Sequence, residues 1–131
     1  METFDVKNCV NPFLIKSALI MHKGNICEVI DMDREKIFIK TGEDNILEIS
    51  DDDWQEIPLN QDWLRRFNLN VDVKIKHSKT FVDWIIKSTG KYYYITIYNE
   101  HYGENPVIGL KYVHQLQEWY LRLTEQNLKL N

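Results

Sequence analysis

The sequence KYVHQLQEWYLRL, residues 111–123, is the longest stretch of the chain with the apolar periodicity of a helix. Its apolar side chains recur three or four residues apart and share one helix face: Tyr112, Val113, Leu116, Trp119, Tyr120 and Leu123. The opposite face takes the polar residues His114, Gln115, Gln117, Glu118 and Arg122. An apolar stripe this wide needs a cover, and because most of the remaining chain has the pattern of strands, we expect a sheet to cover it.

The composition is that of a globular protein with one domain, or two very small ones. The chain has 131 residues, of which 44% are apolar and 27% are charged. Nothing in it resembles a signal peptide or a membrane span, so we expect a cytoplasmic protein with no membrane partner. Cys9 and Cys27 lack the spacing of a CxxC motif, which favours two reduced thiols over a disulfide or a nucleophile.

Charge is distributed unevenly along the chain. Residues 1–57 carry 13 acidic and 6 basic side chains, whereas residues 58–131 carry 7 acidic and 10 basic ones, for a formal net charge of −4. Such an asymmetry indicates an interaction surface on one half, although two ordinary solvated faces would give the same pattern.

The acidic half, residues 1–57, has the pattern of short strands separated by turns. Strands are expected at residues 14–21, 26–30, 35–40, 46–49 and 54–57. Their length and spacing predict a small SH3-like β-barrel or a strongly bent meander.

The second half, residues 58–131, has the pattern of a short helix, a three-stranded antiparallel meander and the C-terminal helix. Asn60 is a suitable N-cap for the first helix, and Asn68 is suited to the left-handed conformation at its end. The buried face of this helix would comprise Trp63, Leu64 and Phe67.

The meander strands are expected at residues 71–77, 80–87 and 91–98, followed by a turn-rich loop over residues 99–109. Leu128 and Leu130 are expected to fold back onto the protein. The sequence therefore predicts an α+β fold in which the two halves pack as one compact unit.

No set of residues typical of catalysis stands out in the sequence. The four histidines, His22, His77, His101 and His114, lack zinc-ligand spacing, and no P-loop, GxGxxG or GxSxG motif is present. The acidic run at residues 51–53 is more typical of a loop at a strand end than of a cation site. We expect a non-enzymatic protein without a cofactor or a metal.

Two surfaces are candidates for binding. The first would complement a basic protein groove, such as a nucleic-acid channel, and comprises Glu43, Asp44, Asp51, Asp52 and Asp53. The second is the outer face of the meander, where basic and aromatic residues could bind single-stranded nucleic acid: Lys74, Lys76, Lys91, Tyr92, Tyr94 and Tyr98. Such residues also occur on exposed strands that bind nothing, and the negative net charge opposes phosphate binding.

Residues 56–67 have the sequence EIPLNQDWLRRF, and residues 111–124 have the sequence KYVHQLQEWYLRLT. These segments resemble the IPLxxxWLxxF segment and the KYVHQLQxxYxxLT ending of a family of small uncharacterised proteins from phages, prophages and mobile elements of Bacteroidota-type bacteria. The family usually has a Gly-Asn turn in its first strand, where this chain has residues 15–18. The resemblance implies no reaction and no cofactor, but it implies a phage or mobile-element setting.

In that setting, small acidic proteins without catalytic motifs are often inhibitors of host defence, such as anti-CRISPR proteins. We therefore expect an interaction protein that binds a host protein or ribonucleoprotein complex, for example an RNA-guided nuclease. The main alternative is an accessory protein that binds single-stranded RNA or DNA through the Lys/Tyr face. A small enzyme of unrecognised type and an assembly protein of a phage particle are further alternatives.

Overall fold

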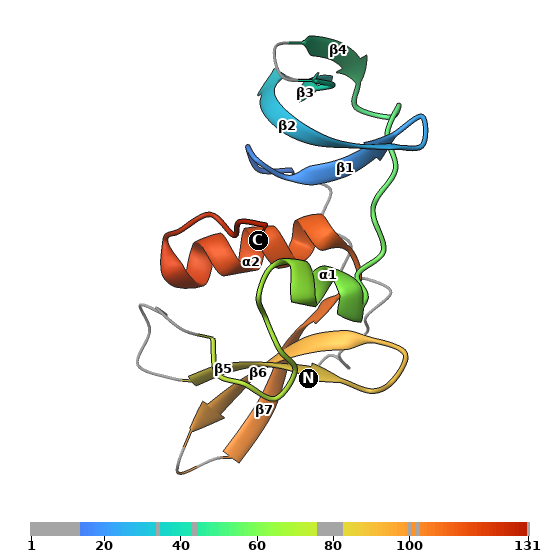
Figure 1. Cartoon of the computed structure of the whole chain (residues 1–131). Helices are drawn as coiled ribbons and strands as arrows, with labels where there is room; N and C mark the ends of the chain where they lie inside the picture. Colours follow the sequence, from blue (N-terminus) through green and yellow to red (C-terminus); the bar gives the residue numbers. More distant parts are fainter. Residues whose placement is uncertain are drawn as a thin grey trace.

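The computed structural model of the chain describes residues 14–33, 35–42, 45–75, 83–99, 101 and 103–130. These residues form an α+β fold with two antiparallel sheets and two helices (Figure 1). The acidic half contributes the first sheet, and the second half contributes the second sheet and both helices.

The first sheet is a meander in the order β1-β2-β3-β4. Its strands are β1 (Leu19–His22), β2 (Asn25–Asp33), β3 (Lys36–Lys40) and β4 (Ile46–Ser50). The register shifts between Val29 and Asp31, and such a bulge bends the strand. The meander is therefore confirmed, but the described strands do not close into a barrel.

Two details of this half differ from the sequence-based expectation. The first strand begins at Leu19, because the chain turns at Lys16 and Ser17, with Ser17 in the left-handed region (φ 76°). The strand expected at residues 54–57 is reduced to a bridge in which Gln55 and Met21 exchange two backbone hydrogen bonds of 2.8 and 2.9 Å.

The first sheet buries one face in a small core of its own. Alternate positions along its strands point into this core, as the period of a strand requires. The core comprises Leu14, Ala18, Ile20, Cys27, Val29, Ile37, Ile39 and Ile49.

The first helix, α1 (Gln61–Arg66), forms where its capping signals place it. The Asn60 side chain accepts a hydrogen bond from the Trp63 backbone N–H at 3.0 Å, and Asn68 has a left-handed conformation (φ 59°). Trp63, Leu64 and Phe67 are buried, so the predicted caps and inward face are confirmed.

The second sheet has the order β5-β6-β7, with strands β5 (Asp83–Ser88), β6 (Tyr93–Asn99) and β7 (Gly103–Leu110). The three-stranded antiparallel meander is confirmed, but its membership differs. Residues 71–75 form only one bridge, between Lys74 and Ile85, and residues 76–77 lie outside the described part. The third strand is β7, which falls in the expected loop of residues 99–109. Its Pro106 is tolerated because β7 is an edge strand.

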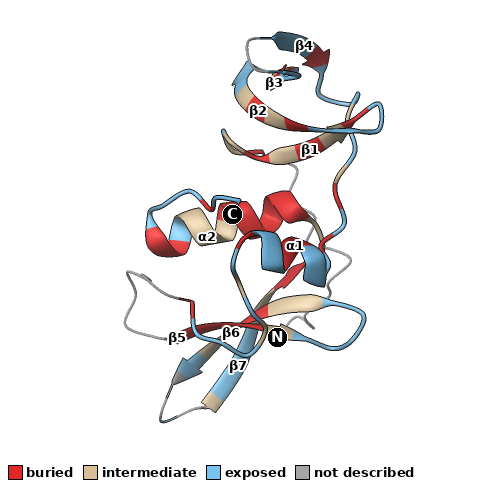
Figure 2. Cartoon of the chain, in the orientation of Figure 1, coloured by how far each residue is buried: buried red, intermediate tan, exposed pale blue. Residues whose placement is uncertain are grey.

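The second helix, α2 (Val113–Thr124), lies between the two sheets (Figure 1). Its apolar residues Val113, Leu116 and Leu123 belong to one core with Ile86 and Ile95 of the second sheet, as expected. Figure 2 shows that much of α2 is buried.

The polar face of α2 is also buried, which corrects the expectation of a polar face turned away from the core. His114, Gln115, Gln117 and Glu118 all belong to the buried polar residues. The first sheet covers this face: the Leu19 N–H donates to Gln117 Oε1 at 2.8 Å, and Gln117 Nε2 donates to the Ser17 carbonyl at 2.9 Å. In the C-terminal tail Leu128 packs into the core, whereas Leu130 is exposed, contrary to expectation.

Candidate functional site

The acidic residues of the first sheet lie on the face opposite to its small core. Asp31 of β2 and Glu48 of β4 lie on either side of Phe38 of β3. Phe38 and Glu48 alternate along their strands with the buried isoleucines of β3 and β4. Lys16 pairs with Asp31 and Lys36 pairs with Glu48, each at 3.6 Å between exposed side chains. Exposed pairs of this kind contribute little and can exchange partners.

A second group of carboxylates lies at one end of the same sheet. Asp51, Asp52 and Asp53 are exposed and form the turn after β4. The Asp51 N–H donates to the Glu35 carbonyl at 2.9 Å, so the turn before β3 lies beside this run. Asp53 Oδ2 lies 3.3 Å from Nε2 of the buried His22.

The structure therefore describes three of the five residues of the predicted acidic surface. Residues 51–53 stand together, whereas Glu43 and Asp44 lie outside the described residues. Glu35, another acidic residue of the same half, joins the group. Its proximity follows from the β3–β4 register, which no local pattern specifies.

An apolar feature accompanies the acidic residues on β4. Ile46 is 62% exposed and Leu47 is 42% exposed, on opposite faces of the strand. Sequence analysis treated these residues as ordinary strand positions. The signal that could have distinguished them is the sequence around β4: residues 43–53 contain six acidic residues and no basic residue.

The structure describes part of the predicted Lys/Tyr face. Tyr94 and Tyr98 lie on the face of β6 opposite to the buried Ile95. Tyr92 precedes β6 and Tyr98 lies near its end, so the two are separated by about 20 Å at the rise of a strand. Lys91 is exposed beside Tyr92, and Lys76 lies outside the described residues.

Carboxylates neutralise the lysines that do lie near this face. Lys74 Nζ is 3.1 Å from Asp83 Oδ2. Lys87 Nζ is 2.9 Å from Asp72 Oδ1 and 3.3 Å from Glu104 Oε1. The hydrogen bond to Asp72, followed by that to Glu104, raises the pKa of Lys87. The charged Lys87 side chain is therefore bound by carboxylates of the protein itself. A phosphate backbone would have to displace them.

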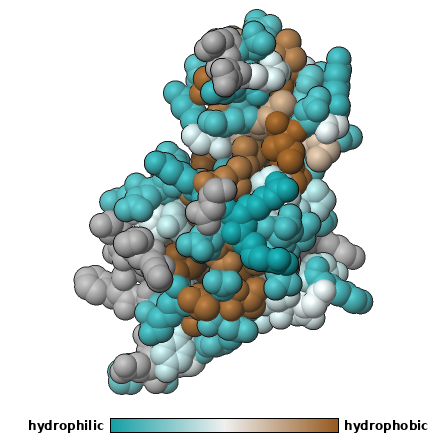
Figure 3. Space-filling view, viewed as in Figure 1, coloured by the Kyte–Doolittle hydropathy of each residue, from teal (hydrophilic) through white to brown (hydrophobic). Residues whose placement is uncertain are grey.

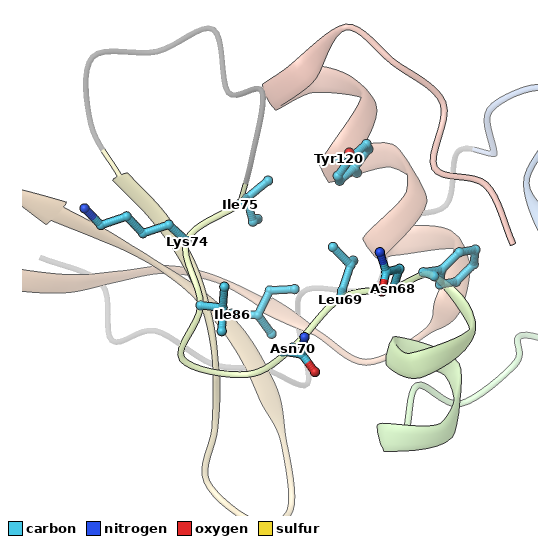
Figure 4. Close-up of a pocket in the computed structure, with 9 residues that line it drawn as sticks. Asn68, Leu69, Asn70, Lys74, Ile75, Ile86 and Tyr120 are labelled. Carbon is cyan, nitrogen blue, oxygen red and sulfur yellow. The ribbon is translucent and has the colours of Figure 1, made fainter. Parts of the chain in front are cut away.

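A pocket of about 270 Å³ opens between α2 and the second sheet (Figure 4). Its lining comprises Phe67, Asn68, Leu69, Asn70, Val73, Lys74, Ile75, Ile86 and Tyr120. Figure 4 shows the Lys74 side chain directed away from Tyr120 and Leu69. Figure 3 shows apolar residues gathered below α2 on an otherwise mostly hydrophilic face. The two titratable residues of the lining are Lys74 and Tyr120, and they do not converge, because Lys74 is directed away from Tyr120.

Cys27, one of the two cysteines for which the sequence analysis considered a nucleophile, is buried in the core of the first sheet. Burial raises the pKa of Cys27, which keeps it as a thiol at neutral pH. Its Sγ has a long contact of 3.7 Å with the Asn25 carbonyl. Within the described ranges, no group of three or more His, Cys, Asp or Glu side chains is placed to bind a metal ion.

The chain was compared with protein-family models, curated proteins and solved structures, and none of them matches it. In the part of the chain that the structure describes, no helix has both the length and the apolar character needed to cross a membrane.

Proposed function

We propose that this protein is a non-enzymatic interaction protein of a phage or mobile element. It binds a host nucleic-acid-handling complex, such as an RNA-guided nuclease, and competes with nucleic acid for a basic groove. The observation that carries the proposal is the exposed acidic end of the first sheet, where Asp51, Asp52 and Asp53 lie beside the Glu35 turn. Carboxylates arranged on a rigid sheet attract a basic groove and speed encounter with it.

One further observation supports the setting, and a second concerns the fold. Residues 56–67 and 111–124 resemble segments of the phage and prophage family, whereas residues 15–18 depart from the Gly-Asn turn of that family. Gln55 pairs with β1 as a fifth strand would, which supports an SH3-like relationship for the first sheet.

The alternative, binding of single-stranded nucleic acid through the Lys/Tyr face, has less support. Tyr94 and Tyr98 could stack on bases. However, Lys74 and Lys87 are already paired with three carboxylates, so this face offers a phosphate backbone little positive charge.

The test is affinity capture from a lysate of a Bacteroidota-type host with the full-length protein, followed by mass spectrometry. We expect recovery of nucleic-acid-binding proteins or ribonucleoproteins, and displacement of these proteins by added single-stranded RNA or DNA. The triple variant Glu35→Gln, Asp51→Asn, Asp52→Asn should lower recovery about tenfold, since each exposed charge contact contributes up to about 1 kcal/mol. Asp53 is left unchanged because of its contact with His22.

The matched control is Asp62→Asn, Glu100→Gln, Glu125→Gln, which removes the same charge from the second half and keeps the contact of Glu104 with Lys87. Recovery should be unaffected in this control. Equal losses in both triple variants would show that only net charge matters. Capture of no nucleic-acid-handling protein would contradict the proposal.

A further inference from the structure

The outer edge of β4 presents unpaired backbone groups to solvent. The β3–β4 ladder is bounded by two hydrogen bonds, Thr41 N–H to the Asn45 carbonyl and Asp51 N–H to the Glu35 carbonyl, both 2.9 Å. Hydrogen-bonded positions alternate along an antiparallel ladder, so between these bonds Leu47 and Ile49 pair with β3. The N–H and C=O groups of the remaining three residues of β4 therefore point outward: Ile46, Glu48 and Ser50.

The other sheet edges are covered or blocked. Gln55 covers β1 through its two bonds with Met21, and the N–H groups of Asp72 and Ile75 donate to β5 at 2.8 Å. The edge strand β7 contains Pro106, which lacks a backbone donor. Among the described residues, β4 and β7 are the edges on which no strand or bridge is seated, and of these two only β4 lacks a proline.

The side chains of β4 also differ from those of a protected edge. Edge strands are usually shielded by charged side chains, above all lysine, by proline or by a bulge; β4 has one charged side chain, Glu48, and neither lysine, proline nor a bulge. Instead it exposes Ile46 on one face and Leu47 on the other. Unpaired backbone groups with apolar side chains on both faces are the features that an added strand requires.

The charges around β4 identify the kind of strand that fits. Acidic residues precede β4 at residues 43–44, occupy its centre at Glu48 and follow it at residues 51–53. A second copy in the symmetric antiparallel register would place Glu48 opposite Glu48, which is unfavourable. A strand with lysine or arginine at both ends and β-branched residues at its centre complements the same edge.

We propose that β4 binds an extended basic segment of a partner protein as an added antiparallel strand. This inference rests on the proposed function for the basic character of the partner, and it specifies how the partner is held. Outward backbone groups supply main-chain hydrogen bonds, Ile46 and Leu47 supply apolar contacts, and the acidic flanks fix the ends.

The test uses amide hydrogen exchange by NMR on the full-length protein with the peptide KKVTVTVKK. In the free protein the amides of Leu47 and Ile49 should exchange slowly, and those of Ile46, Glu48 and Ser50 rapidly. The basic peptide should slow exchange at the latter three at least about tenfold. The peptide EEVTVTVEE, which has the same centre and opposite charge, should leave them unprotected.

Two pairs of variants separate backbone pairing from charge and folding. Glu48→Pro removes an outward N–H without touching the β3 ladder and should weaken peptide binding at least about tenfold relative to Glu48→Gln, which removes only the charge. Ile46→Lys should abolish binding, whereas Ile26→Lys, at a similarly exposed isoleucine of the same sheet, should retain it.

Several outcomes would overturn the edge site: no protection of the three outward amides, equal protection by both peptides, equal binding by Glu48→Pro and Glu48→Gln, or peptide-free protection that grows with protein concentration. The last outcome would indicate a second copy on this edge. Peptide binding without capture of a host complex would refute the proposed function and leave the edge site intact. If Glu48→Pro leaves the capture of a host complex unchanged, the edge site is refuted and the proposed function stands.

Discussion

At the scale of the residue, a single polar side chain determines where α1 begins. Asn60 satisfies the Trp63 N–H, one of the backbone donors that a helix leaves without a partner in its first turn. This role is local, because donor and acceptor lie three residues apart, and for that reason the sequence predicted it correctly.

We expect Asn60→Ala to lower the free energy of unfolding by about 1 kcal/mol, since the Trp63 N–H loses its acceptor. Asn60→Asp keeps the acceptor and adds a negative charge at the helix N-terminus, so it should be neutral or slightly stabilising. Urea unfolding followed by tryptophan fluorescence measures both variants. Equal stability of the two would show that Asn60 does not act as a cap.

At the scale of the element, α2 is buried on both faces. The polar side chain of Gln117 bridges α2 to the first sheet, because it bonds to Leu19 and Ser17, about a hundred residues earlier in the chain. Helical periodicity distinguishes apolar from polar faces, but it does not say whether a polar face meets water or a partner with matching donors and acceptors.

We expect Gln117→Leu to destabilise the protein by about 2–3 kcal/mol, because the Leu19 N–H and the Ser17 carbonyl would be left unsatisfied near the core. The control Gln126→Leu makes the same change at an exposed position and should shift stability by no more than about 0.5 kcal/mol. Chemical unfolding measures the free energy of unfolding of both variants. A neutral Gln117→Leu would mean that packing, not hydrogen bonding, joins α2 to β1.

At the scale of the whole molecule, the two cores are joined through α2. Leu19 and Met21 of β1 pack against the larger core, while Ile20 between them belongs to the smaller one. The strand β1 therefore contributes to both cores, so we expect the two sheets to unfold together.

Cys27 provides a probe of the first sheet, and Trp63, Trp84 and Trp119 report on the second half. Trp54 packs against the first-sheet core, so the background is Cys9→Ser with Trp54→Phe. In this background the thiol should react with a disulfide reagent at pH 8 at least about tenfold more slowly than in the unfolded chain, because burial raises its pKa and restricts access. Its reactivity should rise at the same urea concentration at which tryptophan fluorescence changes. Earlier exposure of Cys27 would show that the first sheet opens independently.

The sequence by itself determined the features that depend on neighbours along the chain: four strands of the first sheet, the caps of α1, the apolar stripe of α2 and its cover by a sheet. Only the tertiary structure decided the membership of the second sheet, where β7 pairs with β6 despite Gly103 and Pro106, while residues 71–75 stay outside. It also decided the burial of Gln117 and the open edge of β4. The physical reason is that strand pairing and polar burial depend on partners distant in sequence, whose register no local pattern specifies.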